Sequence, residues 1–272
     1  MAMVINTNMG AINANRILDG SSREQATTME RLTSGLRINK AADDAAGLAV
    51  VTGMTTQIRG TDMAIRNAND GIGLVQTVDG ATEEVVNMLQ RMREMSIQAL
   101  NGTYSVDNRA QMDAEYQELS REITRVANTT KFNETPLMNE NASVVQLHVG
   151  WETGLQNKIS MQMVNFTGLS ALTQNLLTVA AASLAIATID RNLTSIKMER
   201  AKWGALQNRL EYTIANLLNV NENIQQARSQ IMDADFARES ANMARLQVLQ
   251  QAGMSMLGQA NQQSQSVLQL LQ

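Results

Sequence analysis

Residues 78–99 read VDGATEEVVNMLQRMREMSIQA, and apolar side chains recur in this stretch at alternating intervals of three and four. Residues at such intervals lie along one side of an α-helix, because the helix turns once every 3.6 residues. Glu, Gln, Asn and Arg fill most of the intervening positions, as on a solvated helix face. The stretch therefore predicts a helix with one buried stripe, made of Val78, Ala81, Val85, Met88, Met92, Met95 and Ala99.

Two further stretches keep the same spacing. One begins at Met112 and ends at Val126, and the other begins at Ala182 and ends at Ile231. The longer stretch would extend about 75 Å as a helix, which is far more than a helix of an ordinary globular core. The predicted fold class is mainly α, a long antiparallel helical bundle or coiled-coil rod. We expect its helices over about residues 45–100, 107–130 and 180–232.

The composition agrees with long helices and excludes several kinds of site. Aromatic residues make up only 3% of the chain, with one Pro and 18 Met. The net charge of −4 leaves no excess of basic residues for a nucleic-acid partner. There is no Cys and only one His, so a thiolate metal site and a thiol nucleophile are both excluded.

Sequence motifs of enzymes are likewise absent. No phosphate-binding glycine loop, nucleophile elbow or catalytic dyad occurs, so we expect no enzymatic activity and no cofactor. Asp233 and Asp235 lack the glycine and the later Glu of a calcium loop, and a helix cap or the joint between the two modules is the better interpretation. The most apolar run, Leu176–Ile189, is too short to cross a bilayer, so membrane insertion is not expected.

One region alternates with a period of two. Val145, Leu147 and Val149 alternate with polar residues or Gly, and Ile159 and Met161 do the same after a short loop. Such alternation on both sides of a loop predicts a β-hairpin, over about residues 143–165. We expect this to be the only strand-like region.

The two ends of the chain lack charge but keep a helical pattern. No charged residue precedes Arg16 or follows Arg245, and Gln, Asn and Ser separate the apolar positions. Such helices have little stability alone, so we expect them to fold when copies of the same chain cover their apolar stripes. The ends would pair as one module, residues 1–44 with 233–272, and residues 45–232 would form a rod domain. The stripe residues are Ile5, Met9, Ile12, Leu246, Leu249, Met256, Val267, Leu270 and Leu271.

Several ordered blocks of the sequence resemble those of bacterial flagellins. The first is ERLTSGLRINKAADDAAGLA at residues 30–49, followed by RNANDG at 66–71 and LQRMRE at 89–94. QNRLE at 207–211 matches the return half, and VLQLL at 267–271 matches the closing pattern of the family. The resemblance covers essentially the whole chain, which is similar to a short flagellin without outer domains.

The resemblance implies a function and a set of partners. A flagellin polymerises into the extracellular filament of the bacterial flagellum, which gives swimming motility, and its terminal helices form the inner tube. The family is exported unfolded through the flagellar type III channel without a cleaved signal peptide. The implied partners are further copies of the chain, an export chaperone, and the cap and hook-junction proteins. Two alternatives remain open at this point: a hook–filament junction protein and a secreted coiled-coil protein.

The resemblance also implies surface sites. Arg91, Met95, Gln98 and Glu115 would form a patch that an innate-immune Toll-like receptor of a host recognises, and they also lie in a rod–rod contact zone of the filament. Flagellins are often O-glycosylated on exposed hydroxyls, and the candidates near the expected hairpin are Ser143, Thr153 and Ser160.

Overall fold

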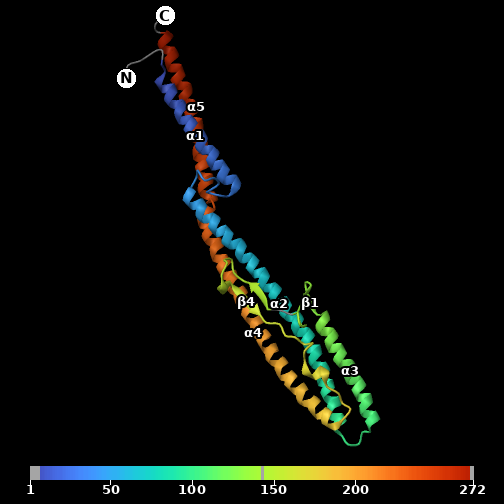
Figure 1. Ribbon diagram of the computed structural model, residues 1–272. Coiled ribbons are helices and arrows are strands. Elements are labelled where there is room, and N and C mark those ends of the chain that lie inside the picture. The colour runs from blue at the N-terminus through green and yellow to red at the C-terminus, as the bar shows by residue number, and fades with distance from the viewer. Residues whose placement is uncertain (1–6, 142–143, 270–272) are drawn as a thin grey trace. The chain divides into compact units, whose positions relative to one another are not determined.

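The computed structural model describes residues 7–141 and 144–269, and the side chains of these residues up to position 262. Long helices dominate these ranges, and two short antiparallel strand pairs lie between the third and fourth helices (Figure 1). The mainly α fold class is therefore confirmed. The helices are α1 (Met9–Ser34), α2 (Ala45–Leu100), α3 (Val106–Thr129), α4 (Val179–Met232) and α5 (Phe236–Gln269). The shorter elements are β1 (Lys131–Phe132), β2 (Thr135–Pro136), β3 (Val145–His148), η1 (Leu155–Asn157), β4 (Lys158–Met161) and η2 (Ser170–Thr173).

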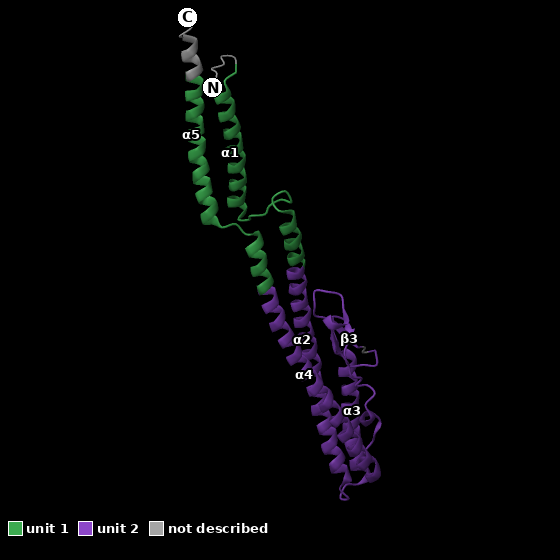
Figure 2. Cartoon of the chain, turned by 90° about the vertical axis from the view of Figure 1, so that its left-hand side faces the viewer, with its two compact units in different colours: residues 1–56, 223–272 green, residues 57–222 purple. Residues whose placement is uncertain are grey.

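The chain divides into two compact units (Figure 2). Unit 1 contains Met1–Thr56 and Asn223–Gln272, and unit 2 contains Gln57–Glu222. Helices α2 and α4 each contribute to both units.

In unit 1, α1 and α5 pack side by side in opposite directions. The Asn8 side-chain amide donates to the Ala260 carbonyl at 3.0 Å, and Arg31, at the other end of α1, pairs with Glu239 at 3.4 Å. Partner numbers on α5 fall as the numbers on α1 rise, which defines an antiparallel pair. The predicted pairing of the N- and C-terminal helices is thus confirmed.

Helix α1 ends at a glycine. Gly35 has φ of +71°, the left-handed conformation that glycine adopts without a steric penalty, and its N–H donates to the Arg31 carbonyl. The chain after it crosses the segment between α4 and α5, where the Ala234 N–H donates to the Gly35 carbonyl at 2.9 Å. At the start of α5, Asp235 Oδ1 accepts from the N–H groups of Ala237 and Arg238, so the predicted helix cap lies here.

In unit 2, α2 and α4 also run in opposite directions. Three polar contacts join them: Arg93 to Asp190 at 2.7 Å, Arg200 to Asp79 at 2.6 Å, and Asn221 to Asp62 at 2.5 Å. As the α2 numbers fall from 93 to 62, the α4 numbers rise from 190 to 221. Arg200 and Asn221 occupy positions of the α4 stripe that would otherwise be apolar. They therefore fix the register of the two helices.

The apolar stripes predicted for this unit form its core. Val78, Val85, Met92, Met95 and Ala99 of α2 are all buried. They pack in one cluster with residues of α3 and α4, including Tyr116, Ile123, Ala182, Ile189, Ile196 and Trp203.

Polar side chains of α3 hold the segment that precedes α4. The Tyr116 hydroxyl donates to the Ala171 carbonyl at 2.8 Å, and the Ser120 hydroxyl donates to the Leu172 carbonyl at 3.1 Å. Asp113 accepts from the Leu176 N–H at 2.8 Å. These bonds position η2 and the residues after it on α3, because a chain without regular structure needs other partners for its backbone groups.

The predicted β-hairpin is present, but it is not the only strand pair. β3 pairs with β4 from Val145 opposite Met161 to His148 opposite Lys158. β1 and β2 form a second, two-residue pair that the alternation pattern does not predict. Its turn residues Asn133 and Glu134 both have positive φ, as a type I′ turn requires. In the sequence, Pro136 indicates only the end of a helix, but proline is also tolerated in an edge strand.

The longer hairpin docks on α2 where that helix has small residues. A Cβ atom on Gly60 would lie 2.7 Å from the Cβ of Trp151, and one on Gly71 would collide with Leu147. Between these two glycines, the Asn67 side-chain amide donates to the His148 carbonyl at 2.9 Å. Glycine at positions 60 and 71, three helical turns apart, therefore permits the close approach.

Among the described residues, no helix is both long and apolar enough to cross a membrane.

Candidate self-assembly surface

The seam between α1 and α5 uses small side chains. Leu18 lies against Gly253, where an added Cβ would be 2.7 Å from a Leu18 methyl group. Gly10 approaches Ala260 in the same way, and a Cβ added to Gly10 would lie 3.7 Å from the Cβ of Ala260. Leu246 is only 1% exposed and is the most deeply buried apolar residue among the described side chains of α5. The seam covers one side of each helix, and most of the other described residues of α1 and α5 are exposed.

The open sides of both helices carry large apolar residues. Met9 is 65% exposed and Met256 is 61% exposed, and Ile12 and Leu249 are exposed as well. A soluble monomer rarely exposes so many large apolar groups on one helical pair without a partner that covers them. Further exposed members of this surface are Ile17, Met29, Phe236, Val248 and Met254.

The predicted stripe residues thus separate into two sets. Leu246 is buried within one chain, whereas Met9, Ile12, Leu249 and Met256 are exposed. Three of the predicted residues, Ile5, Leu270 and Leu271, lie outside the described residues, and the side chain of Val267 does too.

Sequence reasoning missed the α1 side of the seam. Ala11, Ala14 and Leu18 follow the helical spacing, but Ser21 and Thr28 continue the same line and give it a polar character. Thr28 is nevertheless buried. The helical spacing of these residues could have revealed the seam, because small polar residues can occupy a buried helix face as well as apolar ones.

Charged contacts in unit 1 lie toward the end of the helix pair where α1 stops. Glu239 is buried and receives Arg31, and the Lys40 ammonium pairs with Glu30 at 2.7 Å. The hydrogen bond from Lys40 to Glu30 raises the pKa of Lys40. Hydrogen bonds from the N–H groups of Lys40 and Asn39 lower the pKa of Asp43. Toward the chain ends, the pair carries no charged residue before Arg16 or after Arg245, which suits apolar contacts there.

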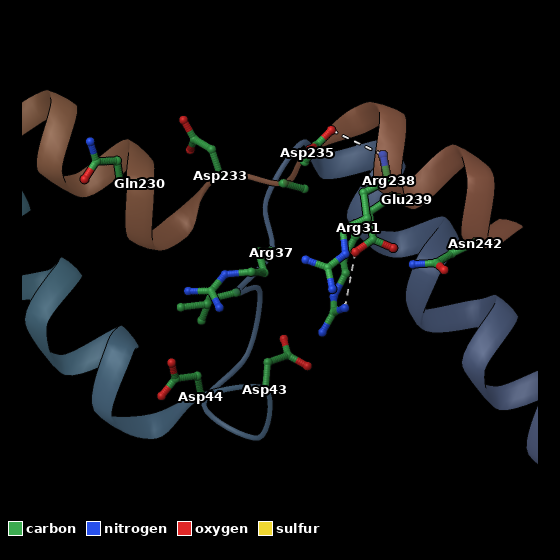
Figure 3. A pocket seen from close by; sticks show the side chains of 12 residues that line it. Arg31, Arg37, Asp43, Asp44, Gln230, Asp233, Asp235, Arg238, Glu239 and Asn242 are labelled. Carbon is green, nitrogen blue, oxygen red and sulfur yellow. Dashed lines mark hydrogen bonds and ion pairs between the residues drawn. The ribbon is translucent and has the colours of Figure 1, made fainter.

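A polar pocket of about 510 Å³ lies at this charged end (Figure 3). Arg31 reaches Glu239 across it, and the Arg37 guanidinium donates to the Ile231 carbonyl at 3.1 Å. Asp44 accepts from the N–H of Gly47, and Asp43 is likewise bonded to backbone N–H groups. The described residues contain no cluster of three His, Cys, Asp or Glu side chains able to hold a metal ion. The ion pair between Arg31 and Glu239 and the hydrogen bond from Arg37 to the Ile231 carbonyl join the helix ends around the pocket.

The surface sites expected in unit 2 are only partly brought together. Arg91 pairs with Glu115 at 2.9 Å and with Glu94 at 3.4 Å, and the exposed Gln98 donates to the Tyr104 hydroxyl. Met95 is 1% exposed and belongs to the core, so its thioether lies beneath this surface and not on it. The stripe that contains Met95 already predicted this burial.

The expected glycosylation positions are described in part. Thr153 and Ser160 are exposed, Thr153 in the hairpin loop and Ser160 on β4 opposite Gln146. Ser143 lies outside the described residues.

Comparison with known proteins identifies the family. The model of the bacterial flagellin N-terminal helical region matches residues 5–143, and that of the C-terminal helical region matches residues 186–271. The chain belongs to the bacterial flagellin family. The flagellin of Halalkalibacterium halodurans is 44% identical over 271 residues, which cover 99% of this chain and 100% of that relative. A flagellar filament 31.3 kDa core protein of Treponema maltophilum is 38% identical, with the same coverage.

Other relatives place this flagellin among the short members. Flagellin B of Vibrio cholerae is 32% identical, but its alignment extends over 375 positions, so it carries inserted segments that this flagellin of 272 residues lacks. A crystal structure of Bacillus cereus flagellin superposes with a TM-score of 0.51 at 28% identity, over 56% of this chain and 88% of that one.

A putative flagellar hook-associated protein from Vibrio parahaemolyticus shares the fold. Its TM-score is 0.59 over 70% of this chain and 100% of that one, at 13% identity. The full-length relatives above and both family models are flagellins or filament proteins, so the hook-junction alternative is not favoured. This flagellin is a structural subunit of the bacterial flagellar filament, which lies outside the cell.

Proposed function

We propose that this flagellin polymerises through the outward apolar sides of α1 and α5, each covered by helices of neighbouring copies. The exposure of Met9, Ile12, Leu249 and Met256 carries this proposal. Burying one such side chain contributes roughly 1.5–3 kcal/mol, so a few of them per contact offset the ordering of a helix end. Contacts between unlike surfaces that do not close into a ring generate an open helical filament.

We assign residues 1–44 and 233–272 to the filament core and residues 45–232 to a rod domain. In this assignment, α1 and α5 gain stability only on arrival at the growing filament. Gly253 and Gly258 lower the helix propensity of α5, and few of its described side chains are buried within one chain. Coupled folding and polymerisation also suits a subunit that is exported unfolded through the flagellar type III channel without a cleaved signal peptide.

The remaining partners follow from family membership. The C-terminal segment would bind an export chaperone before secretion, and the cap and hook-junction proteins would contact the same terminal helices at the two ends of a filament. Arg91, Gln98 and Glu115 form an exposed group of the kind that a host Toll-like receptor recognises in flagellins, without the buried Met95.

Polymerisation of substituted full-length chains tests the assembly surface. Leu249→Asp combined with Met256→Asp places two charges on the outward side of α5 and leaves the buried Leu246 in place. We expect no filaments by electron microscopy at ten times the concentration at which the wild type polymerises, with the circular dichroism melt of the monomer unchanged.

A matched control separates position from charge. Leu155 is 83% exposed on unit 2, so Leu155→Asp adds the same kind of charge elsewhere. Normal filaments from the double variant, or equal loss with the control, would show that the outward side of α5 is not the assembly surface.

A further inference from the structure

The turn between α2 and α3 contains the one Asn-Gly pair of the sequence, Asn101-Gly102. Every other asparagine of the chain is followed by a residue that carries a side chain. Both residues of the pair lie outside the two helices, and both are exposed (Figure 1). A Cβ added to Gly102 would meet nothing within 4 Å, so its backbone nitrogen can be approached freely.

An asparagine in this position can lose its side-chain amide without an enzyme, and asparagine is among the thermolabile residues of proteins. The Gly102 nitrogen loses its proton to base and attacks Cγ of Asn101. A carbon–nitrogen bond forms and ammonia leaves, which gives a five-membered cyclic imide. Water then opens the imide at one of its two carbonyl groups. The products are aspartate and isoaspartate, and the net reaction consumes one water and releases one ammonia.

Negative charge develops at two oxygens of Asn101 during ring closure. Loss of the Gly102 proton spreads charge onto the backbone carbonyl oxygen of Asn101, because the two atoms belong to one peptide group. Attack at Cγ places charge on the side-chain oxygen Oδ1. Hydrogen-bond donors fixed at such oxygens lower the barrier, because they stabilise the charge as it forms.

The turn provides a donor at each of these two oxygens. Arg109 Nη2 donates to the Asn101 carbonyl at 3.3 Å, and the Tyr104 N–H donates to the same oxygen at 3.4 Å. The Thr103 N–H donates to Asn101 Oδ1 at 3.3 Å. Arg109 is held at the end of α2 by a second bond, from its Nε to the Ala99 carbonyl at 3.0 Å. Hydrogen bonds to a charged oxygen are stronger than those to a neutral one, so this arrangement favours the anions over the resting amide.

Asn165 lies in a similar turn that lacks the other requirements. It is exposed, and its Oδ1 accepts from the Thr167 N–H at 2.9 Å. The next residue is the buried Phe166, whose N–H donates to the Met138 carbonyl at 2.8 Å. The nitrogen that would attack Cγ of Asn165 is therefore already bonded. Among the hydrogen bonds of the described residues, by contrast, none has the Gly102 N–H as its donor.

We propose that Asn101 is a site of spontaneous deamidation, at which the folded turn stabilises ring closure and the chain gains an aspartate or an isoaspartate. The modification requires no enzyme, oxidant or metal, and it does not depend on polymerisation. The new carboxylate would lie beside Arg109 at the C-terminal end of α2. A negative charge is unfavourable at that end of a helix, and the guanidinium would offset it.

Peptide mass spectrometry of full-length monomers tests the site. The protein is incubated in alkaline buffer and digested at acidic pH, which stops the reaction. We expect residue 101 to change from amide to acid in two chromatographically separate products, at a rate that rises with pH, while Asn165 keeps its amide. Isoelectric focusing should show a more acidic species in the wild type and not in Asn101→Gln, because glutamine closes a ring less readily. No conversion at position 101, or equal conversion at positions 101 and 165, would overturn the site.

Two substitutions of Arg109 test whether the turn stabilises ring closure. Arg109→Gln should slow conversion about tenfold, because a charge-assisted hydrogen bond to the developing anion is lost. Arg109→Lys keeps the positive charge and should stay within about threefold of the wild-type rate. Circular dichroism of both variants checks that the helices are retained. An unchanged or faster rate in Arg109→Gln, or equal slowing in both variants, would overturn the part assigned to the Arg109 charge.

Discussion

Tyr116 shows how one residue of this flagellin combines a core position with a specific hydrogen bond. The heptad spacing of α3 predicts its burial, and the ring is fully buried. The bond from its hydroxyl to the Ala171 carbonyl could not be predicted, because Ala171 lies 55 positions away in a segment without regular periodicity. The spacing of apolar residues predicts which side of a helix is buried, but it does not predict which backbone group forms a hydrogen bond with the hydroxyl of a buried tyrosine.

Tyr116→Phe should change how stability depends on pH. Burial raises the pKa of the Tyr116 hydroxyl well above its ordinary value of 10.0, and the charge of Asp113 adds to this. The fold therefore favours the neutral phenol, and this contribution is complete below about pH 10 and is lost as the pH rises further. At pH 7 the free energy of unfolding of the variant should be about 0.5–1.5 kcal/mol below that of the wild type, because the hydrogen bond is missing. Between pH 9 and 11 the free energy of unfolding should fall less for the variant than for the wild type.

Guanidinium unfolding of monomers at several pH values measures this difference. Tyr212→Phe is the control, because Tyr212 is exposed and should leave the wild-type profile unchanged. Parallel alkaline profiles for Tyr116→Phe and the wild type would contradict the argument.

At the scale of elements, α2 contains glycines with opposite roles. Gly60 lies against the Cβ of Trp151 and Gly71 against Leu147, whereas a Cβ on Gly80 would meet nothing within 4 Å. The docking of the hairpin could not be predicted from sequence, since period-two alternation indicates strands but not the surface that they cover. The sequence also did not predict the strand pair β1 and β2, because its turn residues Asn133 and Glu134 adopt positive φ without the glycine that usually indicates such a turn.

Gly60→Ala and Gly80→Ala should therefore shift stability in opposite directions. Alanine at position 80 should stabilise α2 by about 0.5–1 kcal/mol, because glycine is a poor helix former. Alanine at position 60 should destabilise unit 2, since the contact at 2.7 Å involves an atom next to the Trp151 backbone, which cannot rotate away. Urea unfolding of both monomers at a concentration below polymerisation measures the two changes. Stabilisation of similar size by both substitutions would show that the hairpin does not rest on Gly60.

At the scale of the whole molecule, the paired terminal helices and the uncharged ends were both predictable from sequence. The sides of these helices that face a neighbour were not. Spacing of three and four places Leu246, Leu249 and Met256 on related faces, but the structure buries only Leu246 within the chain. Which apolar side meets its own chain and which stays open depends on the faces that the two paired helices turn toward each other, and spacing alone does not specify those faces.

Hydrogen exchange on the monomer should reflect this uneven burial. Among the described residues, α1 buries only Thr28 and α5 buries Glu239, Met243 and Leu246, whereas residues 78–99 of α2 bury a nearly continuous stripe. Amides of α1 and α5 should exchange at least a hundredfold faster than those of residues 78–99 and 186–217. Equal protection in all four segments would contradict coupled folding and polymerisation.

The three polar contacts between α2 and α4 bear on the mechanics of a turning filament. A slip of one helical turn, about 5.4 Å, would separate Arg93 from Asp190, Arg200 from Asp79 and Asn221 from Asp62 at once. Two helices that meet only through apolar side chains could shift by one turn at little cost in free energy. Here the same shift must break two ion pairs and one side-chain hydrogen bond together. These contacts therefore resist sliding of α2 along α4 at three separate points, so the two helices should move together when a force acts along their axes.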